Sequence, residues 1–408
     1  ATWKGSFWRV CAPEKRNTNK YSCRQEIGLW PLAYHTLSGI KKNAIRQRYN
    51  REIGDQTNQT RHQLNARKSR STLSLSTAAR GCHPVVFASS KTLAQHQQQL
   101  GTQLVYQGVA SASEAIEGKF NVVNIWKEVP EIHFGKETKL GGEYALKSLE
   151  AATKALKEGS IDVLVTAPIN KSNIQTETFS FPGHTDYLAQ ELGGESLMFM
   201  VSDSLRIGLL TDHVAVSEVS NHITPESIKS KIKTILKSLE QDFGIRKPKV
   251  ALLGINPHNG DQGVIGKEDQ DVLIPTIAEI AHGGSLVFGP YADDSFFGAK
   301  NYTQFDAILA AYHDQGLIPF KTLSFGNGVN FTAGLSKVRT SPDHGTAYDI
   351  AGKGVADHTS FSAAVFTAIK IFKHRAMYKT FTENPLKKAK IVEKRPPKKS
   401  HYKPPTQK

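Results

Sequence analysis

Beginning at Pro84, the chain alternates between short apolar runs and amphipathic helical segments. Val, Leu, Ile and Ala dominate Ile161–Ala167 and Lys249–Ile255, whereas Glu143–Glu158 places leucine and alanine at helical spacing and is followed by Gly159. Apolar strands separated by amphipathic helices are typical of a largely parallel sheet that is covered on both faces. We therefore expect an α/β fold. The other predicted strands are Pro84–Ser89, Arg206–Leu210 and Phe305–Ala311.

A second amphipathic helix is predicted after residue 223. Thr224 is a favoured capping residue, Pro225 suits the first helical turn, and Gly244 can end the helix. Its apolar residues recur at helical spacing, so they should form one buried stripe. The stripe would consist of Ile228, Ile232, Ile235, Leu236, Leu239 and Phe243.

The net charge of +15 is distributed unevenly along the chain. Residues 1–82 contain 16 Lys or Arg against 4 Asp or Glu, residues 373–408 contain 12 against 2, and residues 83–372 contain 24 against 31. These segments therefore carry +12, +10 and −7. We expect a basic leader, an acidic folded body and a disordered basic tail rich in proline and lysine. An acidic body argues against nucleic acid as its partner.

Two further classes of protein are excluded by the sequence. No apolar run approaches the ~20 residues that cross a bilayer, so a membrane-spanning helix is not expected. The three cysteines, Cys11, Cys23 and Cys82, form no CxxC pair, which argues against a disulfide scaffold or a thiolate zinc site. No secretion signal is visible, and we expect a cytoplasmic protein.

Three of the predicted strands are each followed by a loop that carries one histidine. These residues are His213, His258 and His313. Since the carboxyl ends of strands line the ligand crevice of open α/β sheets, the three imidazoles could converge on one divalent metal ion. Alternatively, each histidine could simply form a hydrogen bond within its own loop. The residues alone leave both interpretations open.

Polar loops near these histidines could hold an anion. His184 and Thr185 follow a Pro-Gly turn and precede a predicted helix over Tyr187–Leu192. Lys321, Asn330 and Arg339 lie on a glycine-rich stretch, and cationic side chains with nearby amides suit a phosphate or a carboxylate. Taken separately, each could be an ordinary surface residue. The chain contains no GxGxxG after a strand, no GxxxxGK[ST] and no GxSxG.

Five motifs, in order, resemble the 4-hydroxythreonine-4-phosphate dehydrogenase family of vitamin B6 synthesis. They are GHTDYL at 183–188, LRIGLLTDHVAV at 205–216, GINPHNGDQG at 254–263, YHDQGLIPFK at 312–321 and SPDHGTAYDIAGKGVAD at 341–357. The resemblance extends from Pro84 to Ile371. It implies an isocitrate/isopropylmalate dehydrogenase-like fold, in which α/β/α layers form two interleaved subdomains with a cleft between them.

The resemblance also assigns roles to individual residues. It implies that His213, His258 and His313 hold a divalent metal ion (Zn, Co or Mg). The implied substrate-binding residues are His184, Thr185, Lys321, Asn330 and Arg339. The implied cofactor-binding residues are His344, Gly345, Thr346, Ala347, Asp349 and Ile350. A carboxylate at Asp349 would favour NAD over NADP, because it would repel a 2′-phosphate.

The implied reaction is an NAD(P)-linked oxidation of 4-phosphooxy-L-threonine to a β-keto acid, which loses CO2 to give 3-amino-2-oxopropyl phosphate. The implied assembly is a homodimer that shares the metal site. Asp314 adjoins a histidine and is a candidate base, or it orients a neighbouring group. Two alternatives are a dehydrogenase of a phosphorylated sugar acid, such as 4-phospho-threonate or 4-phospho-erythronate, and an inactive homologue with a binding role.

The leader departs from the family pattern. The family begins with a strand and a GDxxGIGxE loop, whereas Ile53-Gly54-Asp55 is followed here by Gln56–Thr60 without glycine. We hypothesise that residues near 56–82 were translated in a shifted reading frame. A GDxxGIG-like stretch in either of the other two reading frames of the coding DNA would support this hypothesis. Its absence from both of those frames would refute it.

Overall fold

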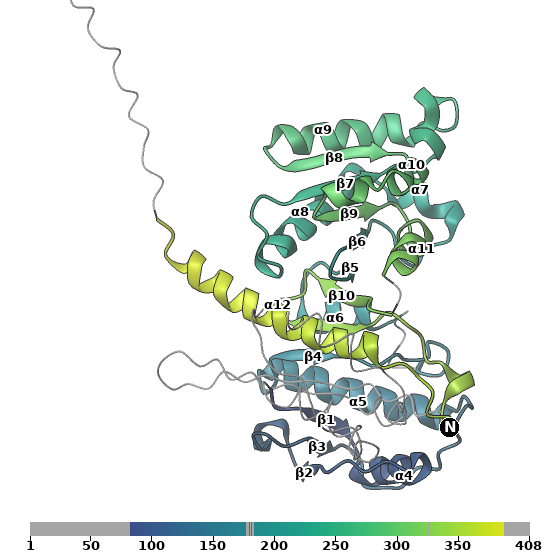
Figure 1. Ribbon diagram of the computed structural model, residues 1–408, viewed down its shortest axis with the longest axis vertical. Helices are drawn as coiled ribbons and strands as arrows, with labels where there is room; N and C mark the ends of the chain where they lie inside the picture. Colours follow the sequence, from purple (N-terminus) through teal and green to yellow (C-terminus); the bar gives the residue numbers. More distant parts are fainter. Residues whose placement is uncertain (1–81, 177–178, 180, 182, 325, 387–408) are drawn as a thin grey trace, which may run out of the picture.

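The computed structural model describes residues 82–386, apart from 177, 178, 180, 182 and 325. Residues 1–81, which include the interrupted Ile53–Thr60 pattern, and residues 387–408 of the basic tail lie outside the described residues. The frame-shift hypothesis therefore stays a hypothesis. Within the described part, two β-sheets and their helices form an elongated α/β arrangement (Figure 1).

A parallel three-stranded sheet lies at one end of the molecule (Figure 1). Its order is β1-β3-β2, and helix α5 packs on β1. Helix α5 begins where the Thr138 side chain accepts a hydrogen bond from the Gly141 N–H, and it ends at Gly159, whose φ is 76°. The elements are Val85–Ala88 (β1), Ser90–Leu100 (α4), Gln107–Val109 (β2), Asn121–Asn124 (β3) and Lys139–Glu158 (α5).

An eight-stranded sheet runs through the rest of the described chain, in the order β4-β11-β10-β5-β6-β9-β7-β8. Neighbouring strands are parallel, except that β10 is antiparallel to β11 and β5, and β5 is antiparallel to β6. The strands are Val163–Val165 (β4), Leu197–Val201 (β5), Arg206–Leu209 (β6), Lys249–Leu253 (β7), Leu286–Tyr291 (β8), Ala307–Ala310 (β9), Val329–Ala333 (β10) and Val338–Pro342 (β11).

Helices cover both faces of this sheet. Alternate residues of β9 point to opposite faces, so that Leu309 packs in a cluster with α8 and Ile308 packs in a cluster with α11. Helix α12 packs on β4, β10 and β11. The helices are His184–Leu192 (α6), Val219–His222 (α7), Pro225–Gln241 (α8), Ile274–His282 (α9), Asp293–Gly298 (α10), His313–Leu323 (α11) and Thr359–Glu383 (α12).

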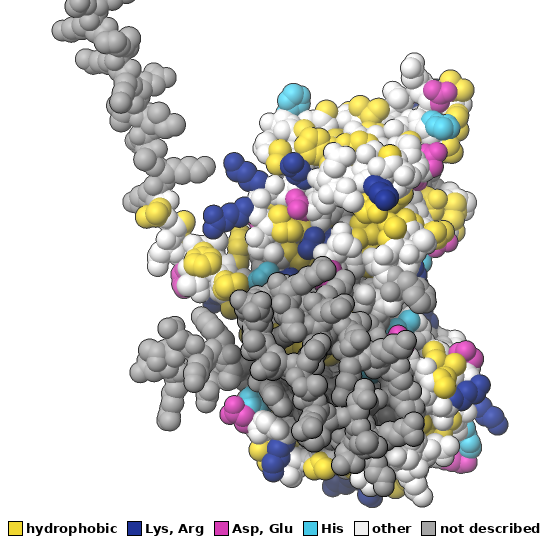
Figure 2. Space-filling model, viewed as in Figure 1, with side chains coloured by type: hydrophobic (Ala, Val, Ile, Leu, Met, Phe, Trp, Pro, Cys, Tyr) yellow, Lys and Arg dark blue, Asp and Glu magenta, His cyan; other side chains and the backbone are white. Residues whose placement is uncertain are grey.

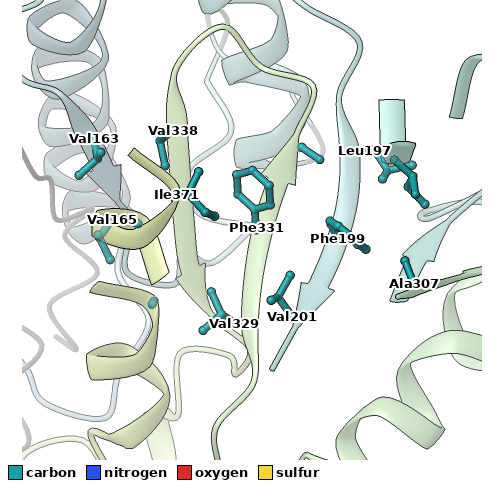
Figure 3. Packing of buried hydrophobic residues seen from close by; sticks show 14 of the residues in the cluster. Val163, Val165, Leu197, Phe199, Val201, Ala307, Val329, Phe331, Val338 and Ile371 are labelled. Carbon is teal, nitrogen blue, oxygen red and sulfur yellow. The ribbon is translucent and has the colours of Figure 1, made fainter. Parts of the chain in front are cut away.

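Part of the main hydrophobic core lies between the large sheet and α12. Phe331 of β10 and Phe199 of β5 are cross-strand partners, and both are fully buried near Ile371 of α12 (Figure 3). Burying a side chain of this size stabilises the fold by about 2–3 kcal/mol. Strands β10 and β11 are therefore held firmly, and these strands carry Asn330 and Arg339.

The predicted α/β class with a mostly parallel sheet is confirmed. Helix α8 has the predicted cap, because Thr224 and Ser227 form a reciprocal capping box, but it ends at Gln241 rather than at Gly244. Helix α12 continues to Glu383, beyond residue 372, where the charge pattern placed the end of the folded body. No helix in the described part is long and apolar enough to cross a bilayer.

Candidate functional site

The three predicted histidine loops follow three adjacent parallel strands. Strands β6, β9 and β7 are neighbours in that order, so their carboxyl ends lie at the same edge of the sheet. His213 follows β6, His313 is the first residue of α11 after β9, and His258 lies in the turn after β7. The sheet therefore brings all three loops to one edge, as parallel strands require.

Two of these histidines come together within the chain. The ring centroids of His213 and His313 are 6.0 Å apart. The Nδ1 atom of His313 is 2.7 Å from the Asp314 carboxylate, and the Nδ1 atom of His213 is 3.8 Å from that of Asp212. At His313, the carboxylate beside Nδ1 can orient the imidazole and leave its Nε2 atom for another partner. Asp314 therefore contacts His313, and its role as a base or as an orienting group stays a prediction.

His258 does not join this pair. It lies in a turn with left-handed backbone conformation, where its φ is 54°. The backbone N–H groups of Ile255 and Asn256 donate to the buried carboxylate of Asp269, which fixes the loop that leads to His258. Among the described residues, no group of three or more His, Cys, Asp or Glu side chains is arranged to hold a metal ion. A single chain thus brings two of the three predicted imidazoles, those of His213 and His313, close to each other.

Arg339 is a buried cation without an anionic partner among the described side chains. Its guanidinium group donates to the Thr166 hydroxyl at 2.6 and 3.2 Å and to the Thr332 hydroxyl at 3.0 Å. Burial lowers its pKa to about 9, so the group is still charged at neutral pH. A buried charge is costly unless it is paired, and so an anionic ligand is expected here.

His184 lies beside this arginine. It is the first residue of α6, after the N-cap Gly183, and it is buried. Burial, followed by the charges of Arg339 and Lys171, lowers its pKa well below the usual value, so the ring is neutral. Its Nε2 atom is buried and has no hydrogen-bond partner within the described part, and the same is true of Oδ1 of Asn330. Such polar atoms are normally satisfied by a ligand or by water.

Lys171 was not predicted from the sequence. Its Nζ atom is 3.2 Å from Nε2 of His213, and its charge is among the causes that lower the pKa of His213 and of His184. The ammonium group therefore lies between the imidazole pair and the buried arginine. A lysine on an irregular loop carries no sequence signal of its own, and only the Pro-Ile-Asn-Lys segment after β4 could have suggested it.

The remaining predicted substrate residues are more open to solvent. Thr185 is half-buried in the first turn of α6, and Lys321 is exposed in the last turn of α11. The charge of Lys321 is a minor cause of the lowered pKa of His344, after burial, so these two residues face the same region. The structure thus links the predicted anion residues to the predicted cofactor segment.

The predicted cofactor segment forms an irregular loop after β11. Ala347 has a φ of 47°, and Asp349 is exposed in the short turn that follows. The loop packs tightly at its far end, because a Cβ atom on Gly352 would lie 3.0 Å from the Phe134 side chain. The other predicted members, His344 to Thr346 and Ile350, belong to the same loop. The exposed carboxylate of Asp349 is available to a ligand.

These features define a class of protein, an α/β fold with a buried cation, unpaired within the described part, near an imidazole pair at one edge of its sheet. Comparison with known proteins agrees. A family model, the pyridoxal phosphate biosynthetic protein PdxA, matches residues 80–368. The chain belongs to this family.

Its relatives are dehydrogenases. A 4-hydroxythreonine-4-phosphate dehydrogenase from Bacteroides thetaiotaomicron is 47% identical over 309 residues, which cover 75% of this chain and 85% of that protein. The crystal structure of such an enzyme from Burkholderia phymatum is 33% identical with a TM-score of 0.61, and it covers 73% of this chain and 92% of its own. One from Klebsiella pneumoniae is 29% identical with a TM-score of 0.62, covering 72% and 91%. The chain is accordingly an oxidoreductase that acts on a CH–OH group.

Proposed function

We propose that this chain oxidises 4-phosphooxy-L-threonine with NAD(P) in the synthesis of pyridoxal phosphate. The observation that carries the proposal is the buried, charged guanidinium of Arg339, which among the described residues donates to two threonine hydroxyls and has no acidic partner. A phosphate dianion would supply the missing counter-charge and accept from two guanidinium N–H groups at once. The names of the relatives support the same substrate.

The phosphate would bind among His184, Thr185, Lys321, Asn330 and Arg339. The neutral His184 ring can donate from its unpartnered Nε2 atom, and the N-terminus of α6 adds backbone N–H groups directed at an anion. Lys321, from the last turn of α11, would supply an exposed second cation. Fixing the phosphate on strands and helix ends orients the C3 hydrogen of the substrate toward the cofactor.

The donor set of the imidazole pair fits a divalent metal ion. Burial lowers the pKa of His213, so that its ring is neutral near pH 7, as a ligand must be. We assign the third ligand to the partner subunit's His258 in a homodimer. Exposed apolar side chains near both loops, Val264 and Ile318, support a subunit contact there. When bound, a zinc, cobalt or magnesium ion would polarise the substrate oxygens.

The cofactor would bind along the loop from His344 to Ile350. The exposed carboxylate of Asp349 can accept hydrogen bonds from ribose hydroxyls, which favours NAD over NADP. When bound, the nicotinamide would accept the hydride released as the C3–H bond of the substrate breaks, and the hydroxyl proton would pass to solvent. The resulting β-keto acid loses CO2 as its C1–C2 bond breaks, and C2 then gains a proton.

Steady-state assays test the proposal directly. We expect reduction of NAD with 4-phosphooxy-L-threonine, loss of that activity after treatment with a chelator, and recovery on addition of a divalent ion. Preferred turnover of 4-phospho-threonate or 4-phospho-erythronate would contradict the assigned substrate while leaving the phosphate site in place. No cofactor reduction with any of these acids would favour the inactive homologue with a binding role.

A further inference from the structure

A second cationic region lies away from the residues discussed so far. A groove of about 890 Å³ is bounded on one side by α8 and on the other by the end of α12. We call it the basic groove and define it by Lys229, Lys233, Lys237, Arg375 and Lys379. Figure 2 shows lysine and arginine side chains gathered on this side of the molecule, between α12 and the helices of the far half. None of the residues assigned to substrate, metal or cofactor lines it.

The lysines of α8 form one row. Lys229, Lys233 and Lys237 follow one another at four-residue intervals, so they share a helix face and are spaced about 6 Å apart along its axis. Like charges at this spacing destabilise a helix by a few tenths of a kcal/mol per pair. An anion in the groove would offset that repulsion.

Most of these charges are not neutralised by the described residues. Arg375 is paired with the buried Asp242, and Lys229 is paired with Glu279 at 2.8 Å. No ion pair within the described part involves Lys233, Lys237 or Lys379. The acidic side chain in the lining, Glu195, accepts a hydrogen bond from Ser230. The groove therefore retains a clear positive charge.

The floor of the groove is bare backbone. Two turns meet there, and a Cβ atom on Gly334 would lie 1.9 Å from the Glu195 carbonyl oxygen, while one on Gly194 would lie 2.4 Å from that of Gly334. Both glycines have positive φ, 86° and 118°, which other residues rarely adopt. The two turns can pack this closely only because neither glycine carries a side chain.

We propose that the basic groove binds an oligophosphate, a small molecule with two or more linked phosphate groups. Its volume is in the range of small-molecule sites. The lysine row of α8 and Lys379 of α12 can contact successive phosphates, and the half-buried ring of Tyr378 offers a surface on which the base of a nucleotide can stack. An isolated monophosphate would engage only part of this charge.

Titration calorimetry with the full chain tests the proposal. The probes are tripolyphosphate, ATP and inorganic phosphate, each without added metal ion. We expect one oligophosphate per chain and at least tenfold weaker binding of inorganic phosphate to the groove. Tighter binding of ATP than of tripolyphosphate would identify a nucleotide, and equal binding would identify the phosphate chain alone as the ligand.

Matched variants separate the groove from other cationic regions. We expect K233Q/K237Q to weaken tripolyphosphate binding at least tenfold, with an unchanged circular dichroism spectrum. The control K91Q/K154Q removes two exposed lysines from α4 and α5 and should change binding less than twofold. Both variants keep the basic residues 387–408. Equal loss in both variants, or undiminished binding by K233Q/K237Q, would overturn the proposal, as would tighter binding of a single-stranded oligonucleotide in the same groove.

Discussion

Arg339 and Arg375 are both largely buried, but only one of them has an acidic partner. The Arg375 guanidinium is 2.5 Å from the fully buried Asp242 carboxylate, whereas Arg339 donates to two threonine hydroxyls. Removing one member of a buried ion pair costs about 3–5 kcal/mol, because the other charge is left alone. Removing an unpaired buried charge relieves a cost instead. Substitution of Arg375 should therefore lower the free energy of unfolding, whereas substitution of Arg339 should leave it unchanged or raise it.

We expect Arg339→Met to abolish binding of inorganic phosphate at the substrate site and to leave the free energy of unfolding unchanged or higher. The measurements are titration calorimetry and urea denaturation. Arg375→Met is the control, and we expect it to lower the free energy of unfolding by about 3 kcal/mol. Similar losses of stability in both variants would show that Arg339 serves the fold rather than a ligand.

Lys171 should influence both imidazoles near it. Its charge lowers the pKa of His213 and of His184, in each case after burial. We expect Lys171→Met to raise the pKa of both rings partway toward the ordinary value and to weaken phosphate binding. Proton NMR titration of the metal-free chain measures the two pKa values. Lys119→Met, at an exposed lysine in another loop, should leave both rings unaffected. Unchanged pKa values in Lys171→Met would place this lysine elsewhere in solution.

Among the elements, α10, α11 and the loop after β7 meet at one hydrogen-bonded point. The Gln315 side chain donates to the Asp293 carboxylate and to the Gly254 carbonyl, both at 2.6 Å. Burial raises the pKa of Asp293 to about 6. Between about pH 4 and pH 6, the Asp293 carboxyl therefore keeps its proton in the native chain, whereas in the unfolded chain it has lost it. The contribution of this carboxyl to the free energy of unfolding therefore falls as the pH rises through that range.

Asp293→Asn should remove this pH dependence. The asparagine oxygen can still accept from Gln315, and no buried negative charge has to form. Relative to the unmodified chain, we expect the variant to gain about 1 kcal/mol between pH 4.5 and pH 7, a value reduced to allow for partial solvent screening. Urea denaturation at intervals of half a pH unit measures the difference. A constant difference across the range would contradict the assignment.

The longest helix, α12, could not be predicted from the sequence, whereas the elements with a strong apolar pattern could. The capped α8 and the buried β6, β7 and β9 are examples. Strands such as β2 and β8 were missed, since β2 has only three residues and β8 combines exposed positions with glycine and proline. Tertiary pairing, rather than local pattern, makes such segments strands.

The site was predictable only in part. His184 and Arg339 do lie together, as the anion interpretation expected, and His213 meets His313. The sequence could not show that the turn after β7 keeps His258 away from that pair, because five successive residues there have left-handed backbone conformation. Nor could it show that Lys171 lies between the two halves of the site. Loop geometry, which short motifs do not encode, decides both.

At the scale of the whole molecule, the proposed metal site would need two chains, because His258 lies apart from His213 and His313. Apolar side chains remain exposed near the two halves, with Val264 82% exposed beside the His258 turn and Ile318 64% exposed on α11. A closed two-fold dimer would bury both patches and bring the complementary halves together. The number of histidine ligands at the metal ion would then depend on the dimer rather than on the fold of one chain.

Mixing two defective variants tests this arrangement. His213→Ala and His258→Ala should each bind little zinc as pure dimers. After the two chains are refolded together in equal amounts, about half of the dimers are mixed, and each mixed dimer contains one site with all three imidazoles. We therefore expect zinc content to recover to about a quarter of the unmodified level, as measured by atomic absorption after dialysis. A site built within one chain could not recover at all, since every chain in the mixture lacks one ligand.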